Sequence, residues 1–346
     1  MKINLGPGPS FIPNELNKKI YESLFNNSGR GFSLIHQSHR SNEFVNYFNE
    51  FKSEIRDFLN IPDTHEILVF QGGATLQFAL IANNLKKIKG KPNYVVSGFW
   101  SSLAAKNASK IREVNEIDIR CQSGLDTSKI NLVNKSYIHF VMNETVDGIN
   151  LENNFDSKNL VVCDASSCLF GKIIDYDKFD IVYSSSSKNL ALPGFTIVIF
   201  KKDIQCEFND DMPDILNFEH WFENDSIPCT PPTPSIYMCR EILKYMARSG
   251  DLDFYDQQNK LKAAYLYDFV DQSPILKNEI QKEYRSDFNF ILYGKNIDIE
   301  NSFINYLETN YANIRGHESR GGLRINCYNL LSLDEVKNLI SFISKF

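Results

Sequence analysis

The sequence predicts an α/β protein whose larger part contains a mostly parallel sheet with helices on both faces. From about residue 15 to about residue 250, short apolar runs typical of buried strands alternate with helix-like segments. Strands that alternate with helices favour parallel pairing through crossover connections. Near residue 250 the pattern changes to a long helical segment, alternating strands and a final amphipathic helix, which indicates a second, smaller α+β unit.

These patterns divide the 346 residues into two expected domains. The chain is too long for one ordinary hydrophobic core. We expect a large domain over residues 15–250 and a small C-terminal domain over 251–346, with the N-terminal arm 1–14 packing near the small domain.

Short runs rich in valine, isoleucine, tyrosine and phenylalanine are the expected strands of the large sheet. They cover residues 66–70, 94–96, 137–141, 161–164, 181–183 and 195–200. A helical pattern follows the first of them, over 76–85, and longer ones cover 252–269 and the segment from Ser332 onward. Parallel sheets bind ligands beyond the carboxyl ends of their strands, and polar residues follow most of these runs.

Composition narrows the functional classes. The chain is 42% hydrophobic and 23% charged, with a formal charge of -6 that is spread along the sequence. It lacks the basic patch with aromatics that nucleic-acid binding requires, and no apolar segment is long enough for a membrane span. Its seven cysteines show no C-x-x-C spacing, so we expect reduced packing residues and no metal site. The Gly- and Pro-broken start lacks a signal peptide, which favours the cytoplasm.

Two neighbouring expected strands end at residues that suggest cofactor chemistry. One strand closes on Asp164, and Lys188 lies just beyond the next. Pyridoxal phosphate (PLP) requires such a pair, because the lysine amine forms a Schiff base with its aldehyde and the carboxylate keeps the pyridine nitrogen protonated. Taken alone, an acid and a lysine at strand ends are more often surface caps, so the neighbouring residues decide.

The other strand ends carry groups that suit a flat, phosphorylated cofactor. Residues 72–75, Gly-Gly-Ala-Thr, lie at a strand-to-helix junction, where free amides bind an anion or a tight turn simply caps a helix. They match neither a dinucleotide-binding fingerprint nor a P-loop. Trp100 could stack on a ring or pack in a core. Thr145 and Ser187 could bind cofactor oxygens or merely end strands.

Two arginines lie beside residues that allow close approach. Arg40 follows Ser38 and His39, and Arg324 follows a Gly-Gly-Leu segment. The guanidinium fork of arginine grips a carboxylate with two parallel hydrogen bonds, as the α-carboxylate of an amino acid substrate requires. Surface ion pairing is the alternative for each arginine.

The chain resembles the phosphoserine aminotransferases, which are class V members of the fold-type I PLP enzymes. The matching segments run almost from end to end, and their order and spacing make the resemblance specific. They are Gly8-Pro9, Ser38-His39-Arg40, Gly72-Gly73 with Leu76-Gln77-Phe78, Gly98-Phe99-Trp100, Asn143-Glu144-Thr145, Asp164-Ala165-Ser166-Ser167, Lys188-Asn189, Thr230-Pro231-Pro232-Thr233, Arg285-Ser286, Gly316-His317, Gly321-Gly322-Leu323-Arg324 and Tyr328-Asn329.

The resemblance implies roles around the cofactor. Lys188 is the expected Schiff-base lysine and proton carrier, Asp164 the partner of the pyridine nitrogen, Trp100 the stacking ring and Thr145 a nearby hydrogen-bond donor. The residues expected around the cofactor phosphate are Gly73, Ala74, Thr75, Ser187, Cys229 and Thr230.

The resemblance also implies how substrates are held. Arg324 would bind the α-carboxylate, while His39, Arg40 and His317 would face the distal phosphate or carboxylate. Thr230, His39 and Arg40 are expected to reach the site of a second subunit. The implied catalytic unit is therefore a homodimer with shared active sites.

Three positions depart from the family pattern. Ser187 stands where glutamine is common, and Cys229 replaces an asparagine, so the phosphate cup has shorter groups. Glu318 occupies a place where the family supplies an arginine to the substrate phosphate. Like charges about 4 Å apart repel by roughly 4 kcal/mol at an effective dielectric near 20. We expect Glu318 to turn away while Arg320 or Arg315 supplies the charge; the alternative is a changed substrate.

The expected reaction is transamination between L-glutamate and 3-phosphohydroxypyruvate, giving O-phospho-L-serine and 2-oxoglutarate in serine biosynthesis. The family also implies the 4-phosphohydroxythreonine step of vitamin B6 synthesis. One alternative is a class V enzyme for a non-phosphorylated 2-oxo acid, because residues 5–9 also resemble the opening of alanine–glyoxylate enzymes. Another is a catalytically silent PLP-fold binding protein, against which the retention of Lys188 and Asp164 argues. A desulfurase-type lyase is disfavoured, since no cysteine lies in an evident catalytic loop.

Overall fold

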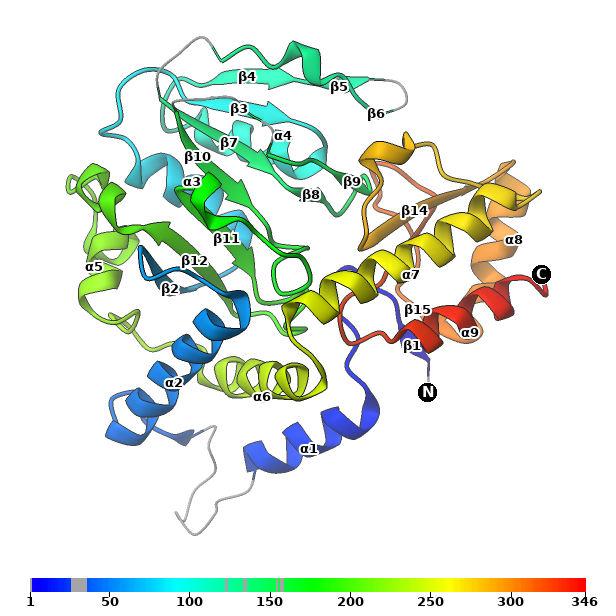
Figure 1. Cartoon of the computed structure of the whole chain (residues 1–346), viewed down its shortest axis with the longest axis horizontal. Helices are drawn as coiled ribbons and strands as arrows, with labels where there is room; N and C mark the ends of the chain where they lie inside the picture. The colour runs from blue at the N-terminus through cyan, green and yellow to red at the C-terminus, as the bar shows by residue number, and fades with distance from the viewer. Residues whose placement is uncertain (1, 26–35, 122–123, 133–135, 154, 156–158) are drawn as a thin grey trace.

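The computed structural model describes residues 2–25, 36–121, 124–132, 136–153, 155 and 159–346. Its centre is a seven-stranded sheet (Figure 1). In order across the sheet, the strands are β2 (His65–Gln71), β12 (Phe195–Lys201), β11 (Ile181–Ser185), β10 (Leu160–Asp164), β7 (Tyr137–Val141), β3 (Asn93–Val96) and β4 (Asn115–Asp118). The strand β12 runs antiparallel to both of its neighbours, whereas the pairs from β11 to β4 are parallel. The predicted α/β fold with a mostly parallel sheet is confirmed.

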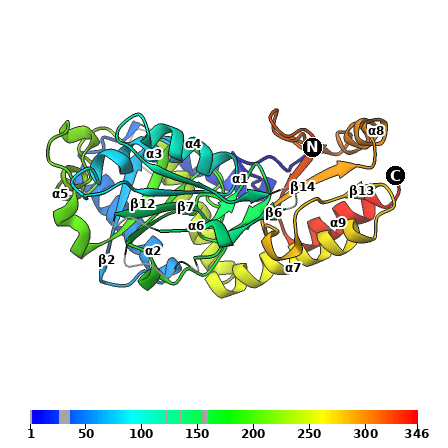
Figure 2. The ribbon, with the colours of Figure 1, turned by 90° about the horizontal axis from the view of Figure 1, so that it is seen from above.

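Helices cover both faces of this sheet, as Figure 2 shows. The helices α3 (Ala74–Asn84) and α4 (Phe99–Ala108) cover one face. The helices of the other face are α1 (Asn14–Phe25), α2 (Asn42–Leu59) and α6 (Thr233–Ser249). Alternate strand residues serve the two layers: Ile67 and Val69 join the core under α2 and α6, while Leu68 and Phe70 join the core under α3 and α4. This period of two follows from the pleat of the strand.

The C-terminal part has its own small sheet and core. Three antiparallel strands, β13 (Leu276–Lys277), β14 (Asn289–Gly294) and β16 (Leu323–Asn326), pack with α7 (Leu252–Gln272), α8 (Ile297–Leu307) and α9 (Leu333–Ile343). The N-terminal strand β1 (Ile3–Asn4) pairs in parallel with β15 (Tyr311–Ala312). The division of the chain at residue 250 into two domains stays a prediction.

Local sequence explains where two of these helices begin. The hydroxyl of Ser332 accepts from the amide of Glu335, whose carboxylate accepts from the amide of Ser332; this capping box satisfies amides that α9 cannot bond internally. The carboxylate of Asp251 caps α7 by accepting from the amide of Phe254 at 2.8 Å.

Short elements complete the chain. The remaining strands are β5 (Arg120–Cys121), β6 (Gly124–Leu125), β8 (Asn143–Glu144) and β9 (Ile149–Asn150), and a further helix is α5 (Phe218–Glu223). Short 3₁₀ helices cover Thr127–Lys129, Tyr176–Lys178, Lys202–Glu207, Asp214–Leu216 and Lys282–Tyr284. Among the described residues, none of the helices combines the length and the apolarity that crossing a membrane would require.

Candidate active site

A cavity of about 360 Å³ lies where the carboxyl ends of β7, β10 and β11 meet the N-termini of α3 and α4. It closes against β16 and the loop before it. The sequence-predicted residues that line it are Gly73, Ala74, Thr75, Trp100, Thr145, Asp164, Ser187, Lys188, His317 and Arg324. Residues that are far apart in the chain therefore meet at one edge of the sheet, where parallel sheets bind ligands.

Four predicted residues do not line this cavity. Cys229 is partly buried, with its sulfur 3.4 Å from Oε1 of Gln71, and Thr230 is exposed. His39 and Arg40 lie in the turn before α2. The expected contacts of Thr230, His39 and Arg40 with the site of a second subunit stay predictions, as does the expected place of Cys229 at the cofactor phosphate.

Asp164 ends β10 and is 4% exposed. Its Oδ1 accepts from the amide of Ser166 at 2.8 Å, and the nearby hydroxyl of Tyr183 also lowers the pKa of this carboxyl. Burial raises the pKa of Asp164, while the bonds from Ser166 and the charge of Lys188 oppose that rise. The carboxyl is thus withdrawn from water but held by donors that favour its ionised form.

A buried histidine and tyrosine lie behind this carboxyl. Nε2 of His139 is 2.8 Å from the hydroxyl oxygen of Tyr183, and the His139 ring stacks on Tyr94 at a centroid distance of 4.8 Å. Burial lowers the pKa of His139 to about 3, so the ring is neutral. Its Nδ1 has no partner in the described part of the chain, which assigns the proton to Nε2. His139 then donates to Tyr183, which leaves the hydroxyl proton of Tyr183 to favour the ionised form of Asp164.

Lys188 lies in the turn between β11 and β12. Its carbonyl accepts from the hydroxyl of Ser10 at 2.6 Å and from the amide of Ala191 at 3.0 Å, which fixes the backbone of the turn. Burial and then the charge of Arg324 lower the pKa of Lys188 to about 8, against the opposing charge of Asp164. A lysine with a lowered pKa has more neutral amine, which is the form that acts as a nucleophile and a base.

The same cavity offers an anion site. The helix α3 begins after Gly73, and no side chain in the described structure caps its first amides. The hydroxyl of Ser187 lies 3.0 Å from that of Ser185 nearby. Gly8 closes over this site with a φ of +138°, and a Cβ there would lie 2.9 Å from the carbonyl oxygen of Ser187. An uncapped helix N-terminus beside hydroxyls suits a phosphate.

Arg324 projects into the cavity from β16 and is 8% exposed. Burial lowers its pKa. Among the described residues, no hydrogen-bond partner reaches its buried Nε. A buried guanidinium group with an unmatched donor implies an anionic ligand, because leaving such a donor unpaired is costly. Together with Asp164, Lys188, the α3 amides and Trp100, this donor shows that the residues present fit PLP and an amino acid substrate.

Comparison with known proteins agrees with this geometry. Residues 3–339 match the family model described as aminotransferase class-V. The chain is 35% identical over 356 residues to a phosphoserine aminotransferase of Haemophilus influenzae, covering 99% of this chain and 97% of that protein. It is 32% identical over 355 residues to the enzyme of that name from Bacillus thuringiensis subsp. konkukian, with the same coverage. The chain belongs to the class-V aminotransferases, in the phosphoserine aminotransferase family.

Solved structures agree closely. The phosphoserine aminotransferase from Bacillus circulans subsp. alkalophilus superposes with a TM-score of 0.93 at 29% identity, covering 100% of this chain and 98% of that one. A PLP-bound phosphoserine aminotransferase from Trichomonas vaginalis gives 0.93 at 26% identity, covering 99% and 100%. The family and fold predicted from the sequence are both confirmed.

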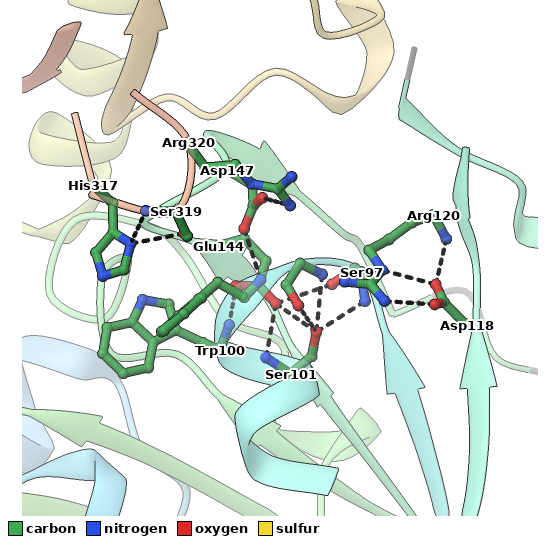
Figure 3. A network of polar contacts seen from close by, with 12 residues as sticks. Ser97, Trp100, Ser101, Asp118, Arg120, Glu144, Asp147, His317, Ser319 and Arg320 are labelled. Atoms are coloured by element: carbon green, nitrogen blue, oxygen red, sulfur yellow. Dashed lines mark hydrogen bonds and ion pairs between the residues drawn. The ribbon is translucent and has the colours of Figure 1, made fainter. Parts of the chain in front are cut away.

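This class-V aminotransferase has a polar network at the edge of the cavity (Figure 3). The sequence does not predict it. Glu144 accepts from the amides of Trp100 at 2.8 Å and Ser101 at 2.9 Å, while Asp147 accepts from the amide of Phe99 at 2.7 Å. These carboxylates cap α4, where negative charge is favourable. Burial and then the charge of Asp147 raise the pKa of Glu144 to about 7. The sequence shows only a strand end followed by Val-Asp-Gly, which is typical of a turn.

The charged residues near Glu318 are already paired. Glu318 is exposed and does not line the cavity. The guanidinium of Arg315 forms two hydrogen bonds to Glu308, at 2.8 and 2.9 Å. Arg320 pairs with Asp147, at 2.5 Å between Nη2 and Oδ1. Glu318 therefore turns away, as expected, but both arginines expected to supply the missing charge bind carboxylates of this chain instead.

Proposed function

We propose that this chain transfers the amino group of L-glutamate to 3-phosphohydroxypyruvate, forming O-phospho-L-serine and 2-oxoglutarate in serine biosynthesis. The observation that carries the proposal is the meeting of Lys188, Asp164 and Arg324 in one cavity of a chain with full-length relatives named phosphoserine aminotransferase. The 4-phosphohydroxythreonine step of vitamin B6 synthesis is proposed as a second role of the same site.

The cofactor is PLP, whose aldehyde condenses with amines and whose ring accepts the electron pair released at the substrate Cα. Lys188 anchors it and, once its amine is freed, Nζ removes the proton from the substrate Cα. Asp164 in its ionised form keeps a proton on the ring nitrogen. Both roles follow from two side chains that meet in the cavity, one at the end of β10 and the other in the turn after β11.

The surrounding residues orient the two reactants. The α3 amides of Gly73, Ala74 and Thr75, with Ser187, hold the cofactor phosphate, and the partner's Thr230 borders the same phosphate. Trp100 covers the ring and Thr145 donates a hydrogen bond beside it. Such fixed geometry lowers the entropy that the reaction must lose.

Arg324 binds the α-carboxylate that every donor and acceptor shares. His317 of the same chain and His39 and Arg40 of a second copy face the distal phosphate or carboxylate. The proposed catalytic unit is therefore a homodimer. We place it in the cytoplasm, since all seven cysteines are free thiols.

The second candidate is transamination of a non-phosphorylated 2-oxo acid. The observation in its favour is that Glu318 stands beside Arg315 and Arg320, which both pair with carboxylates. A third candidate, a silent binding protein, has no use for a lysine whose pKa is lowered next to a buried aspartate.

The test is 2-oxoglutarate formation from L-glutamate by the PLP-loaded protein. The acceptors to compare are 3-phosphohydroxypyruvate, hydroxypyruvate, pyruvate and glyoxylate, with Lys188→Ala as the inactive control. A kcat/KM at least about 100-fold higher for the phosphorylated acceptor is expected, because a matched anion site discriminates by several kcal/mol. Equal or better rates with the unphosphorylated acids would replace the proposal with the second candidate.

A further inference from the structure

The loop from Gly316 to Gly322 is a closed turn. The amide of Gly316 donates to the carbonyl of Gly322 at 2.9 Å, and the amides of Arg320 and Gly321 donate to the carbonyl of His317 at 2.8 and 2.9 Å. Gly321 and Gly322 both have a φ of +69°, which side-chain-bearing residues rarely adopt. A Cβ on Gly316 would fall 1.7 Å from the carbonyl oxygen of Gly321. The loop therefore has a defined internal shape, and its placement depends on what it contacts.

Two side chains of this loop contact α4 or the carboxylate that caps it. The ring of His317 lies against Phe99 with centroids 4.7 Å apart and lines the active-site cavity. Nη2 of Arg320 lies 2.5 Å from Oδ1 of Asp147. Figure 3 shows His317 and Arg320 reaching in different directions from the same loop. Arg320 lines a separate cavity, of about 320 Å³, and not the one that holds Lys188.

Asp147 is a shared anchor for the loop and the helix. Its side chain is 5% exposed, and its second oxygen, Oδ2, accepts from the amide of Phe99 at 2.7 Å. The approach is close, because a Cβ on Gly98 would lie 2.5 Å from Oδ2 of Asp147 and 2.6 Å from Cδ of Glu144. One carboxylate thus joins the first turn of α4 to the loop that carries His317.

We propose that Arg320 is a positioning residue, which with Asp147 latches the His317 loop onto α4 and thereby sets the affinity for the distal anionic group of the substrate. The inference rests on the proposed function, because His317 is assigned there to that group. Removing Arg320 leaves a buried carboxylate without its cation and releases the loop. The opposing assignment, in which Arg320 itself binds the substrate phosphate, requires this pair to break.

The kinetic test uses PLP-loaded Arg320→Gln, Arg320→Lys, Asp147→Asn and the double variant Arg320→Gln/Asp147→Asn. If the latch holds, Arg320→Gln and Asp147→Asn should each raise the KM for 3-phosphohydroxypyruvate about tenfold and leave kcat within about twofold. The double variant should be no worse than either single variant. Arg320→Lys should recover part of the lost affinity. In Asp147→Asn the amide oxygen of the new side chain would still accept from the amide of Phe99, so that variant keeps the α4 cap. Hydroxypyruvate, which lacks the phosphate, serves as the internal control.

A direct substrate contact predicts the reverse pattern. Asp147→Asn would free Arg320 and lower KM for the phosphorylated acceptor, and the double variant would be worse than Asp147→Asn alone. Either result, or an unchanged KM in both single variants, overturns the latch. Arg315→Gln is the matched control, because Arg315 lies beside the same loop but pairs with Glu308, away from α4.

Amide hydrogen exchange of the loop separates the latch from the identity of the acceptor. The latch predicts faster exchange over residues 316–322 in Arg320→Gln and Asp147→Asn than in the parent chain or Arg315→Gln. This measurement needs no substrate, so a wrong acceptor would change the kinetic assays and leave the exchange difference intact. Unchanged exchange in both variants would overturn the latch even if transamination is confirmed.

Discussion

The two walls of the active-site cavity are built in different ways. On one wall, Asp164 ends β10 and is held by the strand ladder, while Lys188 lies in the turn after the neighbouring strand β11, with its carbonyl bound by Ser10 and Ala191. On the other, His317 belongs to a glycine-bounded loop that an ion pair joins to Asp147, the carboxylate that accepts from the first amide of α4. In the proposed function, the first wall carries bond making and the second carries recognition. Changes in the first should therefore reduce turnover, whereas changes in the second should reduce affinity.

The largest effect is expected from Lys188→Ala. We expect kcat to fall by about 10⁴-fold, since both the anchoring amine and the base for the Cα proton are lost. The absorbance band of the bound cofactor should also shift, because alanine has no amine to condense with the aldehyde. Retained turnover would show that another group removes the proton. Lys172→Ala is the matched control, since Lys172 pairs with Glu152 and does not line the cavity.

Asp164→Asn should rank second, with a fall in kcat of about 10³-fold. Asparagine keeps the shape and can accept from the amide of Ser166, but it has no charge to keep the ring nitrogen protonated. The check is single-turnover kinetics with L-glutamate, alongside the affinity for PLP. A fall in PLP affinity with normal turnover would place Asp164 in cofactor retention and contradict its role in the chemistry.

How far the sequence reveals these walls depends on where each residue sits. Asp164 and Lys188 could be predicted, because each follows an apolar run whose length and composition mark a buried strand. Asp147 could not, since Val-Asp-Gly is typical of an exposed turn and only tertiary packing brings it to α4. The strand β4 was missed because Asn115–Asp118 contains a single apolar residue, Ile117. An edge strand with one buried side chain leaves almost no periodic signal.

The arginines that were expected to bind the substrate show the same limit of prediction from sequence. Arg324 was predicted from its glycine-rich neighbourhood, and the cavity includes it. The expectation that Arg315 or Arg320 would replace the charge lost at Glu318 rested on proximity in sequence. In the structure, Arg315 pairs with Glu308 and Arg320 pairs with Asp147 instead. Nothing in the sequence marks these two carboxylates as their partners.

Arg324→Gln tests the recognition wall. We expect kcat/KM to fall by about 100-fold for both L-glutamate and the 2-oxo acid, because both present the same α-carboxylate to the guanidinium fork. The measurement is the pair of half-reactions, each followed by cofactor absorbance. A loss confined to one half-reaction would mean that Arg324 binds a group that the two substrates do not share. Arg324→Lys should recover little, since a point charge cannot form two parallel bonds.

Tyr183→Phe should give a smaller loss, of about tenfold in kcat, because a residue that orients a catalytic group typically contributes on that scale. The change removes the hydroxyl between His139 and Asp164. The ionised carboxyl loses a donor, so the pKa of Asp164 should rise further and the acidic limb of the kcat profile should move to higher pH. An unmoved pH profile with reduced kcat would indicate altered packing instead. The matched control is Tyr137→Phe, whose hydroxyl bonds to that of Tyr94 and not to Asp164.

The smallest expected effect concerns Glu144, which supports the network that joins the two walls. Burial and then Asp147 raise its pKa from 4.5 to about 7. Between these values the folded chain holds a proton that the unfolded chain releases. The stabilisation that this proton provides is therefore complete below about pH 4.5 and is lost as the pH rises through about 7. The free energy of unfolding should fall across this window, as denaturant titrations at a series of pH values would measure.

Glu144→Gln should reduce the fall of the unfolding free energy across this pH window, because glutamine does not titrate. It should also lower stability at acidic pH, since the amide nitrogen cannot accept from the Trp100 or Ser101 amides as a carboxyl oxygen does. Glu116→Gln, a change at an exposed glutamate of β4, serves as the control and should leave the slope as it is. If Glu144→Gln keeps the pH dependence of the unfolding free energy seen in the parent chain, a group other than Glu144 titrates in this window. The prediction for Glu144 would then be wrong.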